Sequence, residues 1–560
     1  MKAENVSTAL ARVLVDELAR CGVTDAVLAP GSRSAPLAMA LHDEPSVRLH
    51  VGIDERSVGF LALGLAKASG RPVVVVTTSG TAAVNLHPAV VEAHESRTSL
   101  LVLTADRPPE LRHAGANQTI DQVGLFGTSV RWSVDVGVPE DRPGANAYWR
   151  STVCHAVATA TGSPPGPVHL NLAFRDPLVP VGDGVEEDLE GRAGGVPWTA
   201  LRRADRRADL AALPLLTGGR GVVIAGDGAA PAAAALVAFA EAAGWPLLAE
   251  PHSGARSGAN AIACYHHLLG VDKFVRSHRP DVVVRVGRAN TSRYMGAIGA
   301  AEHVLIDPDG AWLDPGREVT QVVVADPSTT LASLAERVSP ASPGWLASWV
   351  DADAAARAAI DDVLDTEAHA SEPRTARDLA AALPDGGALV IGSSMPVRDL
   401  DMTMRARTGI RVLGNRGASG IDGFVSTALG VARASNGPTW ALTGDLSLLH
   451  DLGGLLMARP DDRLVLVVAN NDGGGIFSFL SQAEYPGPFE TVFGTPHGRD
   501  LGALVTAAGA THVRVELAAD LTPAVHAAGD GTHVVEVVTD RTENVAVHGR
   551  LQDAVAAAMA

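Results

Sequence analysis

The chain has 560 residues, of which 46% are hydrophobic, and its formal net charge at pH 7 is −18. This charge argues against a nucleic-acid scaffold, because the mean field of the protein would repel a phosphate backbone, and the absence of a G-x-x-x-x-G-K-[ST] loop argues against a kinase. The three cysteines, Cys21, Cys154 and Cys264, lack the close spacing of zinc sites or disulfide frameworks, and no apolar run reaches membrane-spanning length, so we expect a cytoplasmic protein.

The predicted elements begin with an amphipathic helix within residues 1–22, whose acidic residues are not typical of a signal peptide. Short apolar, β-branched runs then alternate with alanine-rich helical stretches. We interpret the runs as strands at 73–78, 100–104, 168–172, 222–226, 282–287, 388–392, 440–444, 464–470 and 533–538. Because these runs are apolar on both faces, they predict parallel sheets covered by helices, and their spacing predicts repeated βα units in doubly wound α/β domains.

Two stretches interrupt this series of βα units. Residues 179–210 are rich in glycine and charge and are typical of a linker. Residues from about 327 to 372 form an Ala/Asp/Ser-rich helical stretch that ends before Pro373. The sequence therefore predicts three α/β domains, at 1–185, 200–330 and 370–560.

An acidic residue stands where the first domain passes from a strand into a helix. Glu55 follows the segment LHVGID and precedes a long helix of small residues. A lone acidic residue in the first turn of a helix is usually a partner of the helix dipole. Its position alone therefore does not identify a functional role.

Two predicted strands of the third domain end in polar residues. The strand at 440–444 leads into Asp445, and the strand at 464–470 ends at Asn470, about 25 residues later, with Asn471 directly after it. The carboxyl ends of parallel strands lie at the edge of the sheet where α/β proteins bind ligands. Carboxylate and amide oxygens are ligands that Mg²⁺ prefers.

The same residue types also form ordinary turns, and the chain contains a decoy of this kind. The predicted strand at 222–226 ends at Gly226 and is followed by Asp227 and Gly228, yet the residues about 25 positions later, EPHSGAR, contain no asparagine pair. We interpret the decoy as a structural turn. Asp445 and the asparagine pair differ from it because both halves of the pattern and their spacing agree.

The pattern resembles the fingerprint of the thiamine diphosphate-dependent enzymes, a Gly-Asp-x motif followed by Asn-Asn at this distance. The resemblance implies that Asp445, Asn471 and the main-chain carbonyl of Gly473 bind Mg²⁺, with Mn²⁺ as an alternative ion, and thereby hold the diphosphate. Leu446 departs from the family pattern, because a third glycine usually stands there. The resemblance also implies that Glu55 is catalytic through a hydrogen bond to N1′ of the aminopyrimidine ring.

The resemblance further implies a pyrimidine-binding first domain, a middle domain and a diphosphate-binding third domain. Ile421 matches the bulky apolar residue that lies beneath the cofactor in this family. The full set of implied cofactor-binding residues is Glu55, Gly80, Asn85, Ser394, Ile421, Asp445, Ser447, Asn471, Ile476 and Phe477.

More particular motifs at 29–41, 104–127, 392–401, 412–430 and 471–480 resemble the menaquinone-pathway synthase family within these enzymes. The likeness covers both terminal domains and is weaker from about 190 to 370. It implies decarboxylation of 2-oxoglutarate and addition of the succinyl carbanion equivalent to isochorismate, with Asn117 and Gln118 at the reaction centre.

Both implied substrates carry two carboxylates, which the planar fork of arginine binds bidentately. The implied substrate-binding residues are Ser32, Arg33, Arg107, Asn117, Gln118, Ser394, Arg398 and Arg416. Arginine is abundant throughout this chain, so each single arginine could also be a solvated surface charge.

The resemblance implies a homodimer or homotetramer with active sites between subunits. Two alternatives remain open at this point. One is another thiamine diphosphate enzyme, such as an acetohydroxyacid synthase or a 2-oxoacid decarboxylase, which handles smaller and less charged substrates. The other is a non-catalytic α/β nucleotide-binding protein, which predicts the loss of the proton-relay carboxylate or of a metal ligand.

Overall fold

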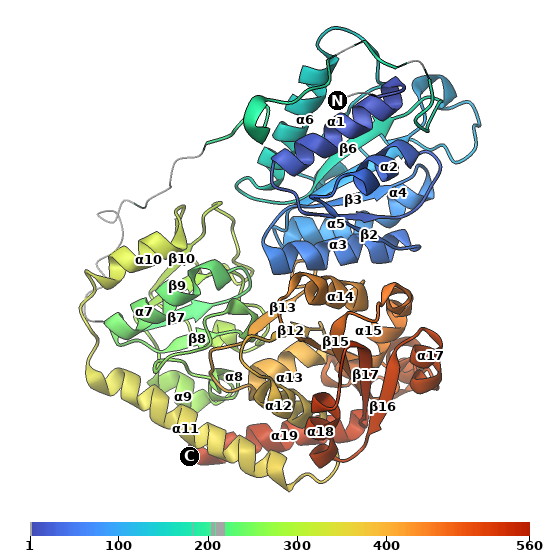
Figure 1. Ribbon diagram of the computed structural model, residues 1–560. Coiled ribbons are helices and arrows are strands. Elements are labelled where there is room, and N and C mark those ends of the chain that lie inside the picture. The colour runs from blue at the N-terminus through green and yellow to red at the C-terminus, as the bar shows by residue number, and fades with distance from the viewer. Residues whose placement is uncertain (1–2, 183, 187, 203–207, 209–218) are drawn as a thin grey trace. The chain divides into compact units, whose positions relative to one another are not determined.

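The computed structural model describes residues 3–182, 184–186, 188–202, 208 and 219–560 (Figure 1). Part of the predicted linker at 179–210 lies outside these residues. Over the described residues the strands form three sheets, and the neighbouring strands of each sheet run parallel. The predicted class of doubly wound α/β domains is thus confirmed, while the exact domain boundaries stay a prediction.

The chain divides into two compact units. The first comprises Met1–Arg203, Asn415–Asn436 and His450–Asp462, and the second comprises Ala204–Gly414, Gly437–Leu449 and Arg463–Ala560. One consequence was not predicted from the sequence. A segment that follows the first two strands of the last sheet packs with the N-terminal part of the chain.

The first unit contains a six-stranded sheet in the order β2-β1-β3-β4-β6-β5. Its strands are β1 Asp25–Leu28, β2 Arg48–Val51, β3 Val73–Thr77, β4 Leu100–Asp106, β5 Trp132–Asp135 and β6 Val168–Ala173. Its helices are α1 Val6–Arg20, α2 Ala35–Asp43, α3 Glu55–Ser69, α4 Thr81–Asn85, α5 His87–Glu95, α6 Ala145–Ala160 and α14 Phe424–Ala434. Helices α1, α2 and α6 bury apolar side chains against one face of the sheet.

The second unit contains two sheets. The smaller has the order β11-β10-β9-β7-β8. Its strands are β7 Gly221–Ala225, β8 Leu247–Ala249, β9 Val282–Val286, β10 Glu302–Ile306 and β11 Gln321–Val323. The helices of this part are α7 Ala233–Ala243, α8 Tyr265–Leu269, α9 Asp272–Ser277, α10 Pro327–Ala335 and α11 Pro343–Thr366. The predicted helical stretch at 327–372 is therefore confirmed as α10 and α11.

The last sheet has the order β13-β12-β14-β15-β17-β16. Its strands are β12 Ala388–Ile391, β13 Arg411–Gly414, β14 Thr439–Gly444, β15 Arg463–Asn470, β16 Thr511–Val515 and β17 Gly531–Val538. The neighbouring helices are α12 Glu372–Ala382, α13 Met395–Thr403, α15 Asp445–His450, α16 Pro486–Phe489, α17 Leu501–Ala507, α18 Leu521–His526 and α19 Arg541–Ala558. Buried Arg256 links the smaller sheet to helix α13, because it donates to the carbonyls of Ala249 in β8 at 2.8 Å and of Asp401 in α13 at 2.7 Å.

All nine predicted strands are confirmed, as β3, β4, β6, β7, β9, β12, β14, β15 and β17. The strands that sequence reasoning missed are short, begin with polar residues or lie at a sheet edge. Edge strands such as β2 and β16 are partly exposed, so they lack the continuous apolar run that marks a buried strand. Among the described helices, none combines the length and apolar character needed to cross a membrane.

Candidate functional site

The predicted site residues divide between the two units. The first unit contains Ser32, Arg33, Glu55, Gly80, Asn85, Arg107, Asn117, Gln118, Arg416 and Ile421. The second unit contains Ser394, Arg398, Asp445, Ser447, Asn471, Gly473, Ile476 and Phe477.

Glu55 is the first residue of α3, as the sequence predicts. Asp54 caps this helix, since its side chain accepts a hydrogen bond from the main chain of Ser57. The Ser57 hydroxyl donates to Asp451 at 3.1 Å, and Asp451 also accepts from the main-chain nitrogen of Ser426 at 2.7 Å. Burial raises the pKa of the Asp451 carboxyl. Asp451 was not identified from the sequence as part of the site. This buried carboxylate holds the turn on which Glu55 lies.

Two glycines allow α3 to lie close against α14. A Cβ at Gly64 would stand 2.1 Å from the Thr427 carbonyl oxygen, and a Cβ at Gly430 would stand 2.3 Å from that of Leu61. Any side chain at these positions would therefore push the helices apart. The small residues noted in the sequence serve this close approach.

Hydrogen bonds join the turn after β3 to the loop that contains Gln118. Gly80 has φ 81° and donates its N–H to Gln122 at 2.8 Å. Gln118 has φ 54°, its side chain donates to the Ser79 carbonyl at 3.0 Å, and its own carbonyl accepts from the Ser79 hydroxyl at 3.0 Å. The structure thus brings together Gly80, which the resemblance implies to bind the cofactor, and Gln118, which it implies to lie at the reaction centre.

Arg33 and Arg107 form a cationic site in the same unit. Arg107 donates to the Ser79 hydroxyl, and burial together with the positive charge of Arg33 lowers the pKa of Arg107. Arg33 donates to the Phe174 carbonyl at 3.0 Å, while its Nε atom is buried and has no hydrogen-bond partner among the described residues. Two neighbouring guanidinium groups with an unsatisfied donor suit a carboxylate.

The loop that carries Arg416 and Ile421 is anchored by a residue that sequence reasoning missed. Glu92 on α5 is buried and accepts hydrogen bonds from the main-chain nitrogens of Gly417 at 2.9 Å and Ala418 at 2.7 Å. Arg416 is buried and Ile421 is half-buried. Glu92 lies 325 residues from Gly417 along the chain, so no local pattern could have indicated the contact.

Four predicted residues of the first unit are exposed: Ser32, Asn85, Asn117 and Gln118. Asn85 donates to the Thr81 carbonyl within its own short helix at 3.1 Å. These residues keep their roles as predictions, and their exposure leaves their side chains available to a ligand.

Asp445 begins α15 directly after β14, as the fingerprint predicts. Strands β14 and β15 pair in parallel with Gly444 opposite Ala469, so Asp445 and Asn471 follow the same edge of the sheet. Asp445 is buried and accepts a hydrogen bond from the Gly473 N–H at 2.9 Å. Burial raises the pKa of the Asp445 carboxyl.

Asn471 is oriented by a second acidic residue. Its Nδ2 atom donates to Glu372 at 2.7 Å, and its Oδ1 atom is buried with no hydrogen-bond partner among the described residues. Burial, together with the charge of Asp399, raises the pKa of Glu372 to about 8. An unsatisfied amide oxygen beside a buried carboxylate fits a hard divalent cation such as Mg²⁺.

Gly473 has φ 142°, and a Cβ there would lie 2.0 Å from the Gly494 carbonyl oxygen, so the position requires glycine. Its own carbonyl accepts from the Gly475 N–H at 3.0 Å and has a second lone pair for a ligand. His497 lies 3.4 Å from the Asp445 carboxylate. Sequence reasoning missed His497, because no fingerprint marks it.

The other predicted residues of the second unit lie on short turns. Ser394 precedes α13 with φ 72°, and its carbonyl accepts from the Arg398 guanidinium. Ser447 is buried on α15, whereas Ile476 and Phe477 are half-buried on a 3₁₀ turn, Gly475–Phe479. The half-buried apolar pair can cover a ligand at this edge.

Three family models match successive parts of the chain. They are described as the N-terminal TPP binding domain of thiamine pyrophosphate enzymes, over residues 8–125, the middle domain of thiamine pyrophosphate, over 193–391, and the C-terminal TPP binding domain, over 401–537. These matches agree with the three parallel sheets of the structure.

Curated relatives match along nearly the whole chain. The 2-succinyl-5-enolpyruvyl-6-hydroxy-3-cyclohexene-1-carboxylate synthase of Thermobifida fusca is 53% identical, over 99% of this chain and 100% of that protein. The synthase of the same name from Saccharopolyspora erythraea is 48% identical, again over 99% and 100%.

Among solved structures, the thiamine diphosphate-dependent 4-hydroxybenzoylformate decarboxylase of Rhodococcus jostii RHA1 is similar with a TM-score of 0.76. The match covers 95% of this chain and 99% of that one at 20% identity. At this identity the likeness shows a shared fold.

Proposed function

We propose a function from one premise: the chain belongs to the family of the 2-succinyl-5-enolpyruvyl-6-hydroxy-3-cyclohexene-1-carboxylate synthases. We infer that it is a transferase of menaquinone biosynthesis that acts in the cytoplasm. It decarboxylates 2-oxoglutarate and joins the remaining four-carbon unit to isochorismate. The relatives do not favour the alternatives of an acetohydroxyacid synthase, a 2-oxoacid decarboxylase or a non-catalytic nucleotide-binding protein.

The observation that carries this proposal is the pair formed by Asp445 and Asn471. The buried carboxylate and the unsatisfied Oδ1 atom would hold Mg²⁺, or Mn²⁺, with the Gly473 carbonyl as a third ligand. The ion would hold the diphosphate of thiamine diphosphate against this edge of the sheet. When bound, that cofactor supplies a nucleophilic thiazolium carbon that attacks the 2-oxo acid and accepts the electrons released with CO₂.

Glu55 would hold a proton at N1′ of the aminopyrimidine ring. Its place at the start of α3, fixed through Ser57 and Asp451, supports this role, because a proton-relay group must be held in one position. Gln118, locked to Ser79, would orient the substrate beside it, with Asn117 as its neighbour.

The arginines would bind the carboxylates of the two substrates. Arg33 and Arg107 provide adjacent cations with an unsatisfied donor, and Arg416 is held on the loop that Glu92 anchors. We assign Arg107 and Arg416 mainly to isochorismate, and we leave Arg33 and Arg398 shared or undecided between the two substrates. Ser32 and Ser394 would add hydrogen bonds.

We further propose a homodimer or homotetramer in which two chains complete each active site. The distribution of Glu55 and Asp445 over two units supports this assembly. Sedimentation at assay concentration tests it, since a fully active monomer would contradict the proposal.

The metal assignment is tested by calorimetry on Asp445→Ala. We expect the affinities for Mg²⁺ and thiamine diphosphate to fall together by about a hundredfold, because one hard ligand is lost. Asp227→Ala is the matched control, since Asp227 follows β7 in the decoy turn and its main chain pairs with Arg288. Unchanged cofactor affinity in Asp445→Ala would overturn the assignment.

A further inference from the structure

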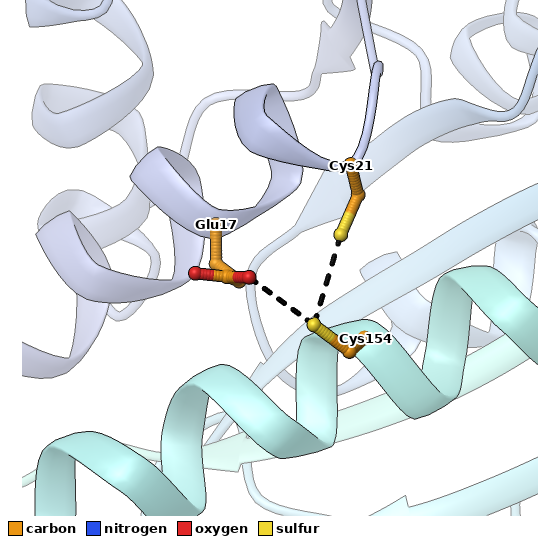
Figure 2. Close-up of side chains that lie close together, drawn as sticks. All are labelled: Glu17, Cys21 and Cys154. Carbon is orange, nitrogen blue, oxygen red and sulfur yellow. Dashed lines mark hydrogen bonds between the residues drawn. The ribbon is translucent and has the colours of Figure 1, made fainter. Parts of the chain in front are cut away.

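Three side chains of the first unit form a cluster that the proposed reaction does not use. Glu17 lies on α1, Cys21 follows the end of the same helix, and Cys154 lies on α6 (Figure 2). The two sulfur atoms are 3.9 Å apart, and the Cys154 sulfur is 3.1 Å from a Glu17 carboxylate oxygen. One ligand atom from each residue lies within 4.8 Å of the others.

We propose that Glu17, Cys21 and Cys154 form a binding site for a thiophilic divalent cation of the zinc class. A tetrahedral zinc ion with Zn–S bonds of about 2.3 Å places two sulfur ligands about 3.8 Å apart, and a sulfur and a carboxylate oxygen about 3.5 Å apart. The observed sulfur–sulfur distance of 3.9 Å and sulfur–oxygen distance of 3.1 Å are close to these ligand–ligand distances. The cation would replace the two thiol protons.

The surroundings of the cluster are typical of the contacts that orient metal ligands. Arg150 is fully buried and donates to the second carboxylate oxygen of Glu17 at 2.7 Å, which leaves the first oxygen facing the sulfurs. The main-chain nitrogen of Thr199 donates to the Cys154 sulfur at 3.3 Å, and that of Trp198 donates to Glu17 at 2.5 Å. Such hydrogen bonds fix the ligands, and Arg150 supplies one positive charge beside two thiolates and one carboxylate.

The arrangement fits a bridging cation better than a disulfide. In Figure 2 the side chains of Cys21 and Cys154 meet end to end, with their Cβ atoms on the outer sides of the sulfur pair. A disulfide needs a sulfur–sulfur bond of about 2.05 Å and Cβ atoms about 3.8 Å apart. The sulfur atoms are 3.9 Å apart, which is well beyond a sulfur–sulfur bond and matches the separation of two sulfur ligands on one tetrahedral zinc ion.

The site has a route of entry and a structural consequence. Cys21 is half-buried, so the fourth coordination position can open toward solvent, whereas Glu17 and Cys154 are buried. A bound cation would tie α1 to α6 and, through Thr199, to the segment that leaves the sheet of this unit. We therefore expect it to stabilise the first unit without taking part in the reaction.

The test titrates Cd²⁺ into the reduced full-length protein in saturating Mg²⁺ and follows thiolate-to-cadmium charge-transfer absorption. Mg²⁺ and the Asp445 site give no such band, because they involve no sulfur. We expect about one equivalent to bind, Zn²⁺ to compete, and the melting temperature to rise. Cys21→Ser should weaken Cd²⁺ binding at least a hundredfold and keep turnover within about twofold of the unchanged protein.

Cys264→Ser is the matched control, because Cys264 is a buried cysteine of the second unit and should leave the band intact. Cys154→Ser should abolish the band, as a second variant in case Cys21→Ser folds poorly. The proposal is overturned if no band forms, if the band survives in both serine variants, or if the reduced protein binds no Zn²⁺.

Discussion

The sheet of the first unit and the last sheet of the second unit can be compared strand by strand. The order β2-β1-β3-β4-β6-β5 corresponds position by position to β13-β12-β14-β15-β17-β16, and both sheets are parallel. In each of them the third and fourth strands of the sequence lie side by side and end at the same edge. The shared topology thus creates two equivalent places for a ligand.

The residues that follow these strands differ in charge. In the first sheet, β3 is followed by Ser79 and Gly80, and β4 by Arg107, which is paired with that serine. In the last sheet, β14 is followed by Asp445 and β15 by Asn471. One edge therefore suits anions and the other suits a cation. Topology therefore determines where a ligand binds, whereas a few side chains after the strands determine its charge.

The largest effect is expected for substitution of the Glu55 carboxylate in the first unit. Glu55→Gln should still bind thiamine diphosphate but exchange the thiazolium C2 proton about a thousandfold more slowly, because the amide cannot relay a proton at N1′. Proton exchange followed by NMR after acid quench measures this. Glu110→Gln, which changes an exposed carboxylate of the same unit, serves as the control. Near-normal C2 proton exchange in Glu55→Gln would mean that Glu55 is not the proton-relay residue.

The cationic edge is tested by Arg107→Ala. Removing one buried charge-assisted pair costs about 2–5 kcal/mol, so ligation to isochorismate should fall by roughly a hundredfold or more. CO₂ release from 2-oxoglutarate alone should continue slowly. Arg142→Ala, at an exposed arginine of the first unit, is the control. If Arg107→Ala abolishes CO₂ release yet leaves the affinity for isochorismate unchanged, Arg107 belongs to the site of the first substrate.

Metal binding at the other edge, after β14 and β15, should depend on how the Asn471 side chain is oriented. Glu372→Leu removes the acceptor of the Asn471 amide, so Mn²⁺ affinity should fall about tenfold. Glu372→Gln retains an acceptor oxygen and should restore most of that affinity. Direct Mn²⁺ binding by electron paramagnetic resonance is the measurement. Equal Mn²⁺ affinity in Glu372→Leu and Glu372→Gln would show that Glu372 does not orient Asn471 as a metal ligand.

The last comparison concerns the sixth strand of each sheet, which carries His169 in β6 and His533 in β17. Burial lowers the pKa of His169 to about 4. The folded state therefore binds fewer protons than the unfolded state between pH 6.5 and 4, so the stabilisation present above pH 6.5 is lost as the pH falls through 4. The full loss is about 3 kcal/mol.

His169→Gln should flatten the fall of the melting temperature between pH 6.5 and 4, because glutamine does not titrate. His533→Gln is the matched control at the equivalent strand, where the side chain is only partly buried. If His169→Gln and His533→Gln both lose melting temperature with falling pH as steeply as the wild-type protein, His169 does not cause the pH dependence.

The buried central strands and the class of fold could be predicted from the sequence, as could the spacing of Asp445 and Asn471. These features depend on local patterns: an apolar run marks a strand buried on both faces, and strand ends in a parallel sheet meet at one edge. The short and edge strands were missed because partial exposure removes that pattern.

Contacts between residues far apart in the sequence, both in the candidate site and in the cysteine cluster, could be identified only from the fold. Glu372 lies 99 residues from Asn471, Asp451 lies 394 residues from Ser57, and Cys21 lies 133 residues from Cys154. An acidic residue at a helix start or an isolated cysteine has no local signature of its partner. These contacts arise because the packing of helices on the sheets brings remote segments together, and a single sequence carries no periodicity at such separations.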